Sequence, residues 1–363
     1  MAWILEDWLV NTAVPEDQEE VAGVMLGVPD GKPLKLRDVV QFRHLLDDFI
    51  FVLAPHSKSL AHQVFRSCVD MFKWFGFPLN TKKLFDPDFR QIVFGIGLDT
   101  QKGCFYIPDS KALKALAGLN CFLKCSSVSL KELQSLIGLL AFLARALVAS
   151  RTFLRRLIDL TCGVAHQHQR IGLDGVMDDL NWWITVLESR HMFAMKFQDS
   201  KILRPSEHSL STDSCLFACG AVFEKQWFSF RFPEAMQKHS GDIALKELAA
   251  LVLAVMTWSS ALSGKRILVH CDNQAVVAVT KSGTCKNQVI MSLMRYFVLQ
   301  CLKRDLSVVV SYIPSEENTG PDLLSRMKVK EFRRCFPVSQ EYATPILEFW
   351  KELYESSLFE HYG

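Results

Sequence analysis

Residues 243–256 read IALKELAALVLAVM, a run in which apolar side chains occupy almost every position around a helix. Such a helix is expected to be buried on most of its faces. Glu247 stands out in this run, because a buried carboxylate is strongly destabilising unless a cation compensates it. The stretch therefore predicts a core helix together with a charged group that the fold must neutralise.

The segments on both sides of this helix alternate between strand and helix patterns from residue 209 onward. Apolar and β-branched runs predict strands at 209–223, 227–232, 266–272 and 306–313. Helical periodicity predicts helices at 243–262, 274–281, 287–303 and 321–327. Strands first, followed by alternating helices and strands, indicate a mixed sheet covered by helices.

Three further acids accompany Glu247 on these elements. Asp213 lies within a predicted strand, Asp272 ends an apolar strand, and Asp322 follows Pro321 in the first turn of a helix. Singly, each has a structural explanation as a strand-edge, ion-paired or capping acid. As an ordered set they provide the hard oxygen ligands of a magnesium site, and two metals about 3.5–4 Å apart can clamp both the attacking water and the leaving oxygen of a phosphodiester.

The bulk composition is that of a globular chain with locally placed charge. The 363 residues are 49% hydrophobic and 22% charged. Because the formal net charge is only +2, a polyanion could bind only where positive side chains cluster locally. The eleven cysteines and an acidic start without a signal-peptide pattern favour reduced thiols, in the cytoplasm or the nucleus. The best candidate for a membrane span, Leu136–Ala144, stops at Arg145, well short of the roughly 18 residues that a membrane span needs.

Upstream of residue 209 the pattern is a hairpin followed mainly by helices. Two apolar runs flank Asp47 and Asp48 and predict a β-hairpin with the acids at its tip. Helices are expected at 58–75, 110–124 and 176–189, and another begins after Ser129, where Glu132 completes a capping box. Short strands are expected within 88–107 and a linker at 201–208. The cluster Arg151, Arg155 and Arg156 suits either a phosphate backbone or a solvated helix face.

These residues resemble the ribonuclease H family, and more closely the reverse transcriptase–ribonuclease H segment of tyrosine-recombinase retrotransposons of the DIRS and Ngaro group. The resembling motifs are Asp213-Ser214 with Gly220, Lys246-Glu247-Leu248, Cys271–Val277, Tyr312–Asn318 and Pro321–Arg326. Departures are Tyr312 for His, Ser315 for Gly and Pro321 for Ala, and the loop 315–320 contains no histidine. All four metal-binding positions of the family are filled.

The resemblance extends upstream over most of the chain. Leu45–Phe49 is similar to the polymerase Tyr-x-Asp-Asp motif, Gly76–Lys83 to the following lysine motif, and Val93–Ile96 to the primer grip. The implied organisation is an irregular segment (1–40), a partial reverse-transcriptase palm (41–105), a thumb/connection-like helical region (106–200), a ribonuclease H-like domain with a mixed five-stranded sheet and helices on both sides (205–328), and a tail (329–363).

The resemblance implies hydrolysis of the RNA strand of RNA–DNA hybrids by two Mg²⁺ ions, with Mn²⁺ as an alternative. Asp213, Glu247, Asp272 and Asp322 would be both the catalytic residues and the metal ligands. The residues expected to contact nucleic acid are Arg151, Arg155, Arg156, Asn273, Gln274 and Asn318. Because no apolar strand bearing an aspartate precedes Asp47, polymerase activity is expected to be lost, with Asp47 and Asp48 as relics. The alternative is a non-catalytic, domesticated nucleic-acid-binding protein.

Overall fold

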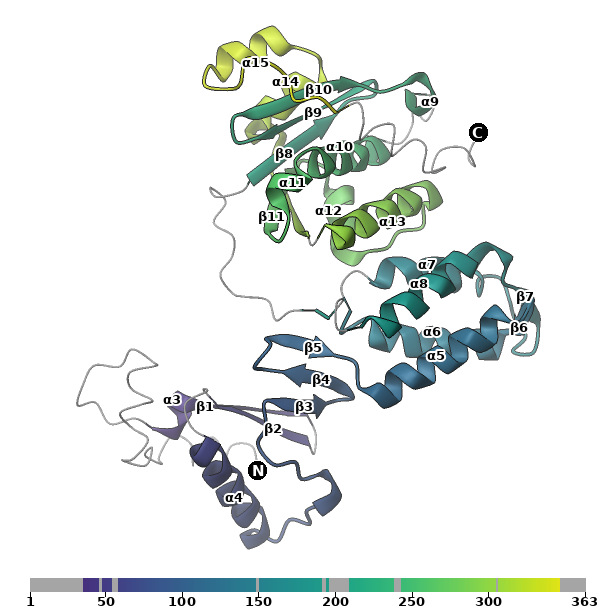
Figure 1. The fold of residues 1–363 in the computed structure, drawn as a ribbon, viewed down its shortest axis with the longest axis vertical. Helices are drawn as coiled ribbons and strands as arrows, with labels where there is room; N and C mark the ends of the chain where they lie inside the picture. The colour runs from purple at the N-terminus through teal and green to yellow at the C-terminus, as the bar shows by residue number, and fades with distance from the viewer. Residues whose placement is uncertain are drawn as a thin grey trace. The chain divides into compact units, whose positions relative to one another are not determined.

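The computed structural model describes residues 35–45, 48–53, 58–147, 150–190, 194–195, 209–237, 243–304 and 306–346 (Figure 1). They fall into two compact units, of which one ends at Gln91 and the other begins at Ile92. The predicted linker at 201–208 and most of the predicted irregular start lie outside the described residues.

The first unit, here called the hairpin unit, is an antiparallel hairpin with one long helix. β1 (Val40–Leu45) pairs with β2 (Asp48–Leu53), and α4 (Lys58–Trp74) follows, so the predicted hairpin and helix are both confirmed. The helix forms because apolar residues recur at helical spacing and share one core with the hairpin. That core contains Val39, Val40, Phe42, Leu60, Val64, Cys68 and Phe72. The short elements of this unit are α3 (Leu36–Val39) and η1 (Thr81–Lys83).

The second unit begins within β3, the first strand of a small sheet with the order β3-β4-β5, and then becomes helical. The capping box predicted for the helix after Ser129 is present, because Ser129 Oγ accepts a hydrogen bond from Glu132 N and the Glu132 carboxylate accepts one from Ser129 N. The elements are β3 (Arg90–Val93), β4 (Ile96–Asp99), β5 (Cys104–Tyr106), α5 (Asp109–Leu123), β6 (Ser127–Ser129), α6 (Leu130–Leu143), η2 (Ser150–Leu154), α7 (Arg155–Asp159), β7 (Arg170–Gly172), η3 (Asp174–Val176) and α8 (Met177–Glu188). Residues 109–190 are called the helical region below.

The rest of the second unit, residues 209–346, is a five-stranded domain whose sheet has the order β10-β9-β8-β11-β12. β9 runs antiparallel to both β10 and β8, whereas β11 is parallel to both β8 and β12, which confirms the mixed five-stranded sheet. The elements are β8 (Ser209–Ser214), β9 (Ala218–Phe223), β10 (Gln226–Arg231), α9 (Glu234–Gln237), α10 (Ile243–Thr257), α11 (Ser259–Leu262), β11 (Arg266–Cys271), α12 (Gln274–Ser282), α13 (Gln288–Lys303), β12 (Ser307–Tyr312), η4 (Ser315–Glu317), α14 (Thr319–Ser325) and α15 (Val329–Cys335).

Helices cover both faces of this sheet. A Cβ on Gly220 of β9 would lie 2.4 Å from Leu324 Cβ, so α14 packs directly on that face. Burial and then the negative charge of Glu247, on α10, raise the pKa of the neighbouring Cys219, so this side chain lies on the side of α10. Because successive side chains of a strand point to opposite faces, α10 and α14 lie on opposite sides of the sheet. Residues 245–256 of α10 are all buried, as its apolar sequence predicts.

A segment after α15 runs along the outer strand of the sheet. Gln340 N donates a hydrogen bond to Lys225 O, and Thr344 N donates one to Trp227 O. The Trp227 indole in turn donates to Gln340 O at 2.8 Å and packs on Phe332 of α15. The segment 336–346 is therefore hydrogen-bonded along the outer edge of β10, whose other edge pairs with β9.

Candidate active site at the carboxyl ends of the central strands

The four predicted carboxylates come from four different elements of the five-stranded domain. Asp213 lies in β8, Glu247 in α10, Asp272 directly after β11, and Asp322 in α14. β8 and β11 are adjacent and parallel, with Cys271 opposite Thr212, so Asp213 and Asp272 leave the sheet at the same edge. In open α/β sheets this edge is where ligands bind.

Glu247 is held in place by two donors while it is almost fully removed from solvent. Ser214 N donates to Glu247 Oε1 at 3.1 Å, and the Cys271 thiol donates to Oε2 at 4.0 Å. Its exposed fraction is 3%. Burial, followed by the negative charges of Asp213 and Asp272, raises the pKa of Glu247 to about 9, against which Ser214 acts.

Asp213 lies close enough to the other acids for their negative charges to change its pKa. Burial raises the pKa of Asp213 to about 7, and a hydrogen bond from the Ser325 side chain opposes this rise. The charges of Asp272 and Asp322 raise the pKa further, whereas Arg326 lowers it. Together with the coupling of Glu247 to Asp213 and Asp272, these interactions link all four carboxylates into one electrostatic group.

Asp272 and Asp322 are each oriented by a side chain from the loop and helix that follow β12. Ser315 Oγ donates to Asp272 Oδ2 at 2.8 Å. Arg326 Nε donates to Asp322 Oδ1 at 2.7 Å, one helical turn away. Both acids are more exposed than Asp213 and Glu247, and they form the open side of the site.

A sulfur atom belongs to the cluster and was not anticipated from the sequence. Among the described residues, Glu247, Cys271 and Asp272 each offer a ligand atom, and these atoms lie within 4.8 Å of one another. The strand alternation carried the signal, because Cys271 shares its buried face with Ile267 and Val269 at the strand end. The supporting roles of Ser214, Ser315 and Ser325 had no comparable signal, since their partners are remote in sequence.

The six residues expected to contact nucleic acid divide into two groups. Four have partners within the chain: Arg155 pairs with Asp159, Arg156 with Asp179, Asn273 accepts from Ala275 N and Val276 N as the cap of α12, and Asn318 donates to Thr212 O. Asn318 is also buried, with an exposed fraction of 1%. Arg151 and Gln274 are exposed. None of these contacts tests binding, and the nucleic-acid roles stay predictions.

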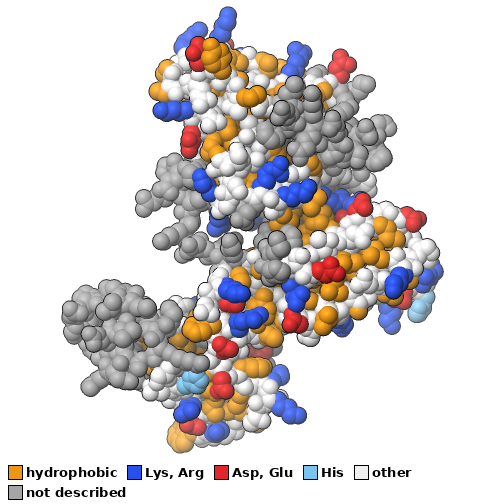
Figure 2. Space-filling model, viewed as in Figure 1, with side chains coloured by type: hydrophobic (Ala, Val, Ile, Leu, Met, Phe, Trp, Pro, Cys, Tyr) orange, Lys and Arg blue, Asp and Glu red, His pale blue; other side chains and the backbone are white. Residues whose placement is uncertain are grey.

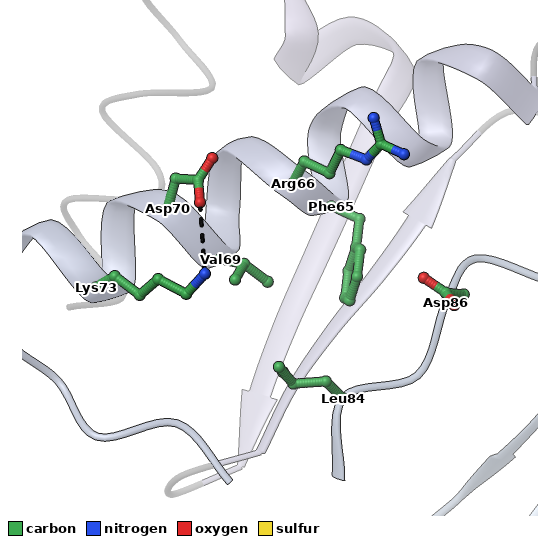
Figure 3. A pocket seen from close by; sticks show the side chains of 7 residues that line it. All are labelled: Phe65, Arg66, Val69, Asp70, Lys73, Leu84 and Asp86. Atoms are coloured by element: carbon green, nitrogen blue, oxygen red, sulfur yellow. Dashed lines mark ion pairs between the residues drawn. The ribbon is translucent and has the colours of Figure 1, made fainter. Parts of the chain in front are cut away.

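The acids of the hairpin unit have a different setting. Asp47 lies outside the described residues, and Asp48 is exposed at the start of β2, opposite Leu45. A hollow of about 430 Å³ in this unit lies between α4 and the segment that follows η1. Figure 3 shows its lining, in which Asp70 is ion-paired with Lys73 at 3.7 Å. Two basic and two acidic side chains line this hollow, so it has no net charge to select an ion.

Charge on the molecular surface is mixed in sign. Figure 2 shows Lys and Arg side chains interspersed with Asp and Glu on the visible face, as the net charge of +2 would suggest. Among the described helices, none combines the length and the apolar character required to cross a membrane.

No protein-family model matches the sequence, and no curated protein does. Among solved structures, the chain is similar to a foamy viral protease-reverse transcriptase dRH in complex with double-stranded DNA, with a TM-score of 0.38 and 15% identity over 75% of this chain and 46% of that one. It is also similar to the foamy viral protease-reverse transcriptase with an RNA/DNA hybrid (0.38, 14% identity, 74% and 35% covered) and with double-stranded DNA (0.37, 14% identity, 82% and 60% covered). The chain thus spans 35% to 60% of the length of these three proteins.

Proposed function

We propose that the five-stranded domain is a two-metal ribonuclease H that hydrolyses the RNA strand of an RNA–DNA hybrid. One observation carries the proposal: carboxylates from β8, α10, the end of β11 and α14 form one electrostatic group at one edge of the sheet. A protein does not bury Asp213 and Glu247 beside Asp272 for stability, because each raises the cost of ionising the others. A bound cation removes that cost.

The donor set fits hard divalent cations. Carboxylate oxygens are the ligands that Mg²⁺ and Mn²⁺ prefer, and four residues here supply them: Asp213, Glu247, Asp272 and Asp322. When bound, such ions supply Lewis-acid stabilisation of the charge that develops on the phosphate and its leaving oxygen. Cys271 adds a soft atom at the edge of the set, but its pKa is raised to about 12 by burial, so it remains a neutral thiol.

The residues of the chain provide the fixed frame for this chemistry. Ser214 and Cys271 hold the Glu247 carboxylate, Ser315 holds Asp272, and Arg326 holds Asp322. Pre-organised ligands avoid reorganisation during the reaction, which is where most of the rate enhancement of such sites arises. Water enters from the side of Asp272 and Asp322, because Asp213 and Glu247 are buried.

The preference for a hybrid would come from groups at the rim of the site. Gln274 is exposed one residue after the cap of α12, and Tyr312, 43% exposed, lies opposite Cys271 at the end of β12. Amide and phenol groups of this kind can bond the 2′-hydroxyl that distinguishes an RNA strand. The motif set further supports an origin in a tyrosine-recombinase retrotransposon of the DIRS and Ngaro group.

The test is cleavage of a labelled RNA–DNA hybrid by the purified full chain with Mg²⁺, with Mn²⁺ and with EDTA. Metal-dependent cutting of the RNA strand is expected, with at least a ~1000-fold loss in Asp213→Asn, since losing the negative charge of one ligand removes several kcal/mol of charge stabilisation. Asp174→Asn, an exposed acid of η3, is the matched control and should cut normally. A folded chain that binds the hybrid and never cuts it would favour the non-catalytic alternative.

A further inference from the structure

Lys246, which directly precedes Glu247 on α10, is a lysine inside the protein core. Its exposed fraction is 0%, although lysine side chains are rarely removed from solvent completely. Its ammonium group donates a hydrogen bond at 2.5 Å to the backbone oxygen of Leu216, in the turn between β8 and β9. The two-metal chemistry described above gives this buried group no task.

The turn that accepts this hydrogen bond does not fix its own shape. Residues 215–217 contain no glycine or proline, the residues that most often set the backbone of a tight turn. Leu216 and Phe217 are exposed, so burial of their side chains contributes little to holding the turn in place. The shape of the turn therefore depends on hydrogen bonds from neighbouring elements, of which Lys246 supplies one.

Two further contacts tie the ends of the turn to the rest of the five-stranded domain. The Cys215 thiol donates to Ser325 O of α14 at 3.1 Å. Phe217 O accepts a hydrogen bond from Phe232 N, just after β10, at 2.8 Å. These contacts hold the first and last residues of the turn, whereas Lys246 links its middle residue to α10.

Lys246 and Glu247 hold the same short segment from adjacent positions on α10. Glu247 Oε1 accepts a hydrogen bond from Ser214 N at 3.1 Å, two residues before the carbonyl that Lys246 contacts. An ionised carboxylate only accepts and an ammonium only donates, so the two side chains cannot exchange partners and the register is fixed. These two hydrogen bonds are called the clamp below. Asp213 directly precedes the first of them.

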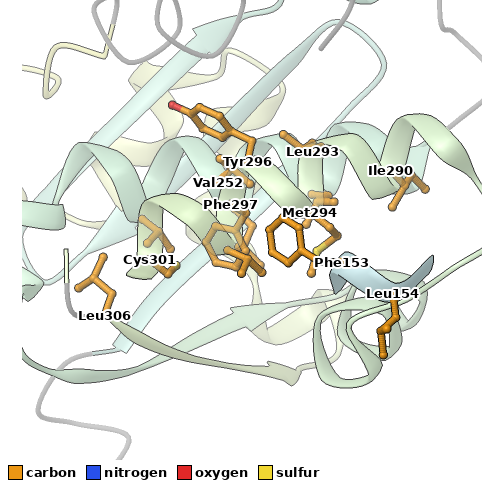
Figure 4. Close-up of a cluster of buried hydrophobic side chains, with 14 of the residues drawn as sticks. Phe153, Leu154, Val252, Ile290, Leu293, Met294, Tyr296, Phe297, Cys301 and Leu306 are labelled. Atoms are coloured by element: carbon orange, nitrogen blue, oxygen red, sulfur yellow. The ribbon is translucent and has the colours of Figure 1, made fainter. Parts of the chain in front are cut away.

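α10 is a rigid support for the clamp because its other sides pack into the core. Figure 4 shows Val252 of α10 in one buried cluster with Leu293 and Phe297 of α13, and the same cluster includes Phe153 of the helical region. A helix packed in this way cannot shift alone, since protein interiors are as dense as organic crystals. The position of Asp213 relative to α10 is therefore decided at the turn.

We propose that Lys246 is a positioning residue for the metal site, which holds Asp213 at a fixed place relative to Glu247 through the clamp before a cation binds. The inference rests on the proposed function, because it concerns the cation affinity of the same carboxylates. Without a cation the negative charges of Asp213 and Glu247 repel each other, and the clamp opposes their separation. Removing a group that orients metal ligands typically weakens metal binding by about 10- to 100-fold.

The experiment measures binding of Mn²⁺ to the purified full chain by isothermal titration calorimetry, without nucleic acid. Lys246→Met keeps most of the length of the side chain but removes the donor, and it should weaken Mn²⁺ binding by about 10-fold. Lys265→Met is the matched control. Lys265 Nζ also donates to a backbone oxygen, that of Ala261 at 3.0 Å, but it precedes β11 and so lies at the opposite end of that strand from Asp272. This control should bind Mn²⁺ as the wild-type chain does.

The direction of the change separates positioning from a simple effect of charge. Removing a positive charge near a cation site would, by Coulomb's law alone, strengthen Mn²⁺ binding, so weaker binding by Lys246→Met reports the lost hydrogen bond. The same variant should need about 10-fold more Mn²⁺ for half-maximal cleavage of a hybrid, with a rate at saturating Mn²⁺ close to wild type. A general loss of structure would instead lower the saturated rate.

Amide hydrogen exchange on the wild-type chain tests the clamp without any substitution, and it decides the question if Lys246→Met does not fold. Ser214 N is hydrogen-bonded to Glu247, and Cys215 N to Ala218 O. Because the clamp fixes this segment before a cation binds, both amides should exchange slowly in EDTA and equally slowly with Mn²⁺.

The outcomes separate this inference from the proposed function. Equal Mn²⁺ affinities of the wild-type chain and Lys246→Met would overturn the positioning role even if the chain cuts hybrids. Amides of Ser214 and Cys215 that are protected only after Mn²⁺ is added would overturn it as well. Weaker Mn²⁺ binding by Lys246→Met, in a chain that never cuts, would support the role of the lysine and contradict the nuclease. A wild-type chain that binds no Mn²⁺ would contradict the two-metal function, and the positioning role with it.

Discussion

The tip of the β1–β2 hairpin and the carboxyl ends of β8 and β11 both carry acids. The acid at the hairpin tip is exposed to solvent, whereas two of the acids near β8 and β11 are buried. Asp48 is exposed at the tip, facing Leu45 across two strands that are adjacent in sequence. Asp213 and Glu247 are 5% and 3% exposed, and they meet acids from two other elements. Turn chemistry accounts for an acid at a hairpin tip. Nothing in local folding accounts for buried acids that converge, so the second arrangement is the one that indicates chemistry.

The largest expected contrast between the two places is in catalysis. Asp272→Asn should lower the rate of hybrid cleavage by about 1000-fold, because it replaces a charged carboxylate ligand with a neutral amide. Asp48→Asn should leave that rate unchanged. Cleavage rates of both variants under saturating Mg²⁺ measure the contrast. Equal losses of cleavage rate in the two variants would show that Asp48 also participates in hydrolysis, which would contradict the distinction between the two groups of acids.

Gly220 allows α14, which carries Asp322, to lie directly on the sheet. In Gly220→Ala the added Cβ would lie 2.4 Å from Leu324 Cβ and 2.7 Å from Ser325 N, so the helix must shift. We expect the free energy of unfolding to fall by about 3 kcal/mol, the upper end of typical overpacking costs.

The control for Gly220→Ala is Gly138→Ala, on an exposed face of α6 with no atom within 4 Å of the new Cβ. It should stabilise the chain by up to ~1 kcal/mol, since alanine is the better helix former. Urea denaturation of both variants gives the two values. A tolerated Gly220→Ala would mean that α14 is not held against β9 as described.

Glu247 should oppose stability in the metal-free protein. Burial raises the pKa of Glu247 from its ordinary value of 4.5 to about 9 in the folded chain, so folding at intermediate pH requires proton uptake. The penalty is absent below pH 4.5, where both states are protonated, and it grows as the pH rises above that value. Glu247→Gln should therefore raise the free energy of unfolding in EDTA at pH 7 by on the order of 2 kcal/mol.

Thermal denaturation at pH 4.5 and pH 7 measures this effect. The stabilisation should shrink at the lower pH, and cleavage should be lost in the same variant. Asp48→Asn, from the exposed hairpin tip, should show no such pH-dependent gain. A destabilised Glu247→Gln at pH 7 would imply that the carboxylate has a compensating cation within the protein.

Glu132 represents an exposed acid whose partners are local, and it gives the smallest effect. Hydrogen bonds from Ser129 lower the pKa of Glu132, so its contribution to helix α6 is present above pH 4.5 and is lost as the pH falls through the lowered folded value. Ser129→Ala should cost about 1 kcal/mol of unfolding free energy at neutral pH. Chemical denaturation at acid and neutral pH tests this prediction. If Ser129→Ala lowers the free energy of unfolding equally at both pH values, the Glu132 carboxylate does not contribute to the stability of α6.

Elements with strong periodicity were predictable from sequence. The helices expected at 58–75, 110–124, 243–262 and 287–303 match α4, α5, α10 with α11, and α13. The strand expected over 209–223 is instead two strands, β8 and β9, joined by a tight turn in which Cys215 N donates to Ala218 O. Residues 215–217 contain no glycine or proline to signal that turn.

The sequence singles out the acids of the candidate site, whose catalytic roles stay predictions, but it does not indicate the residues that surround them. Asp213, Glu247, Asp272 and Asp322 each stand out against a strand or helix pattern, whereas their partners are defined by three-dimensional contacts. Arg156 illustrates the limit: its charge suggests a phosphate ligand, but its partner Asp179 lies 23 residues away on another helix. The domain boundaries and the nucleic-acid contacts stay predictions.

The segment 336–346 gives the five-stranded domain a protective border. Unpaired edge strands offer free N–H and C=O groups to other polypeptides, which is a common route to aggregation. Here Gln340 and Thr344 occupy part of that edge at Lys225 and Trp227. A polypeptide trimmed after α14, near Arg326, would keep all four carboxylates of the candidate site and yet leave this edge unpaired. Work on the isolated domain should therefore retain the chain through Ile346, or self-association could be mistaken for a property of the full chain.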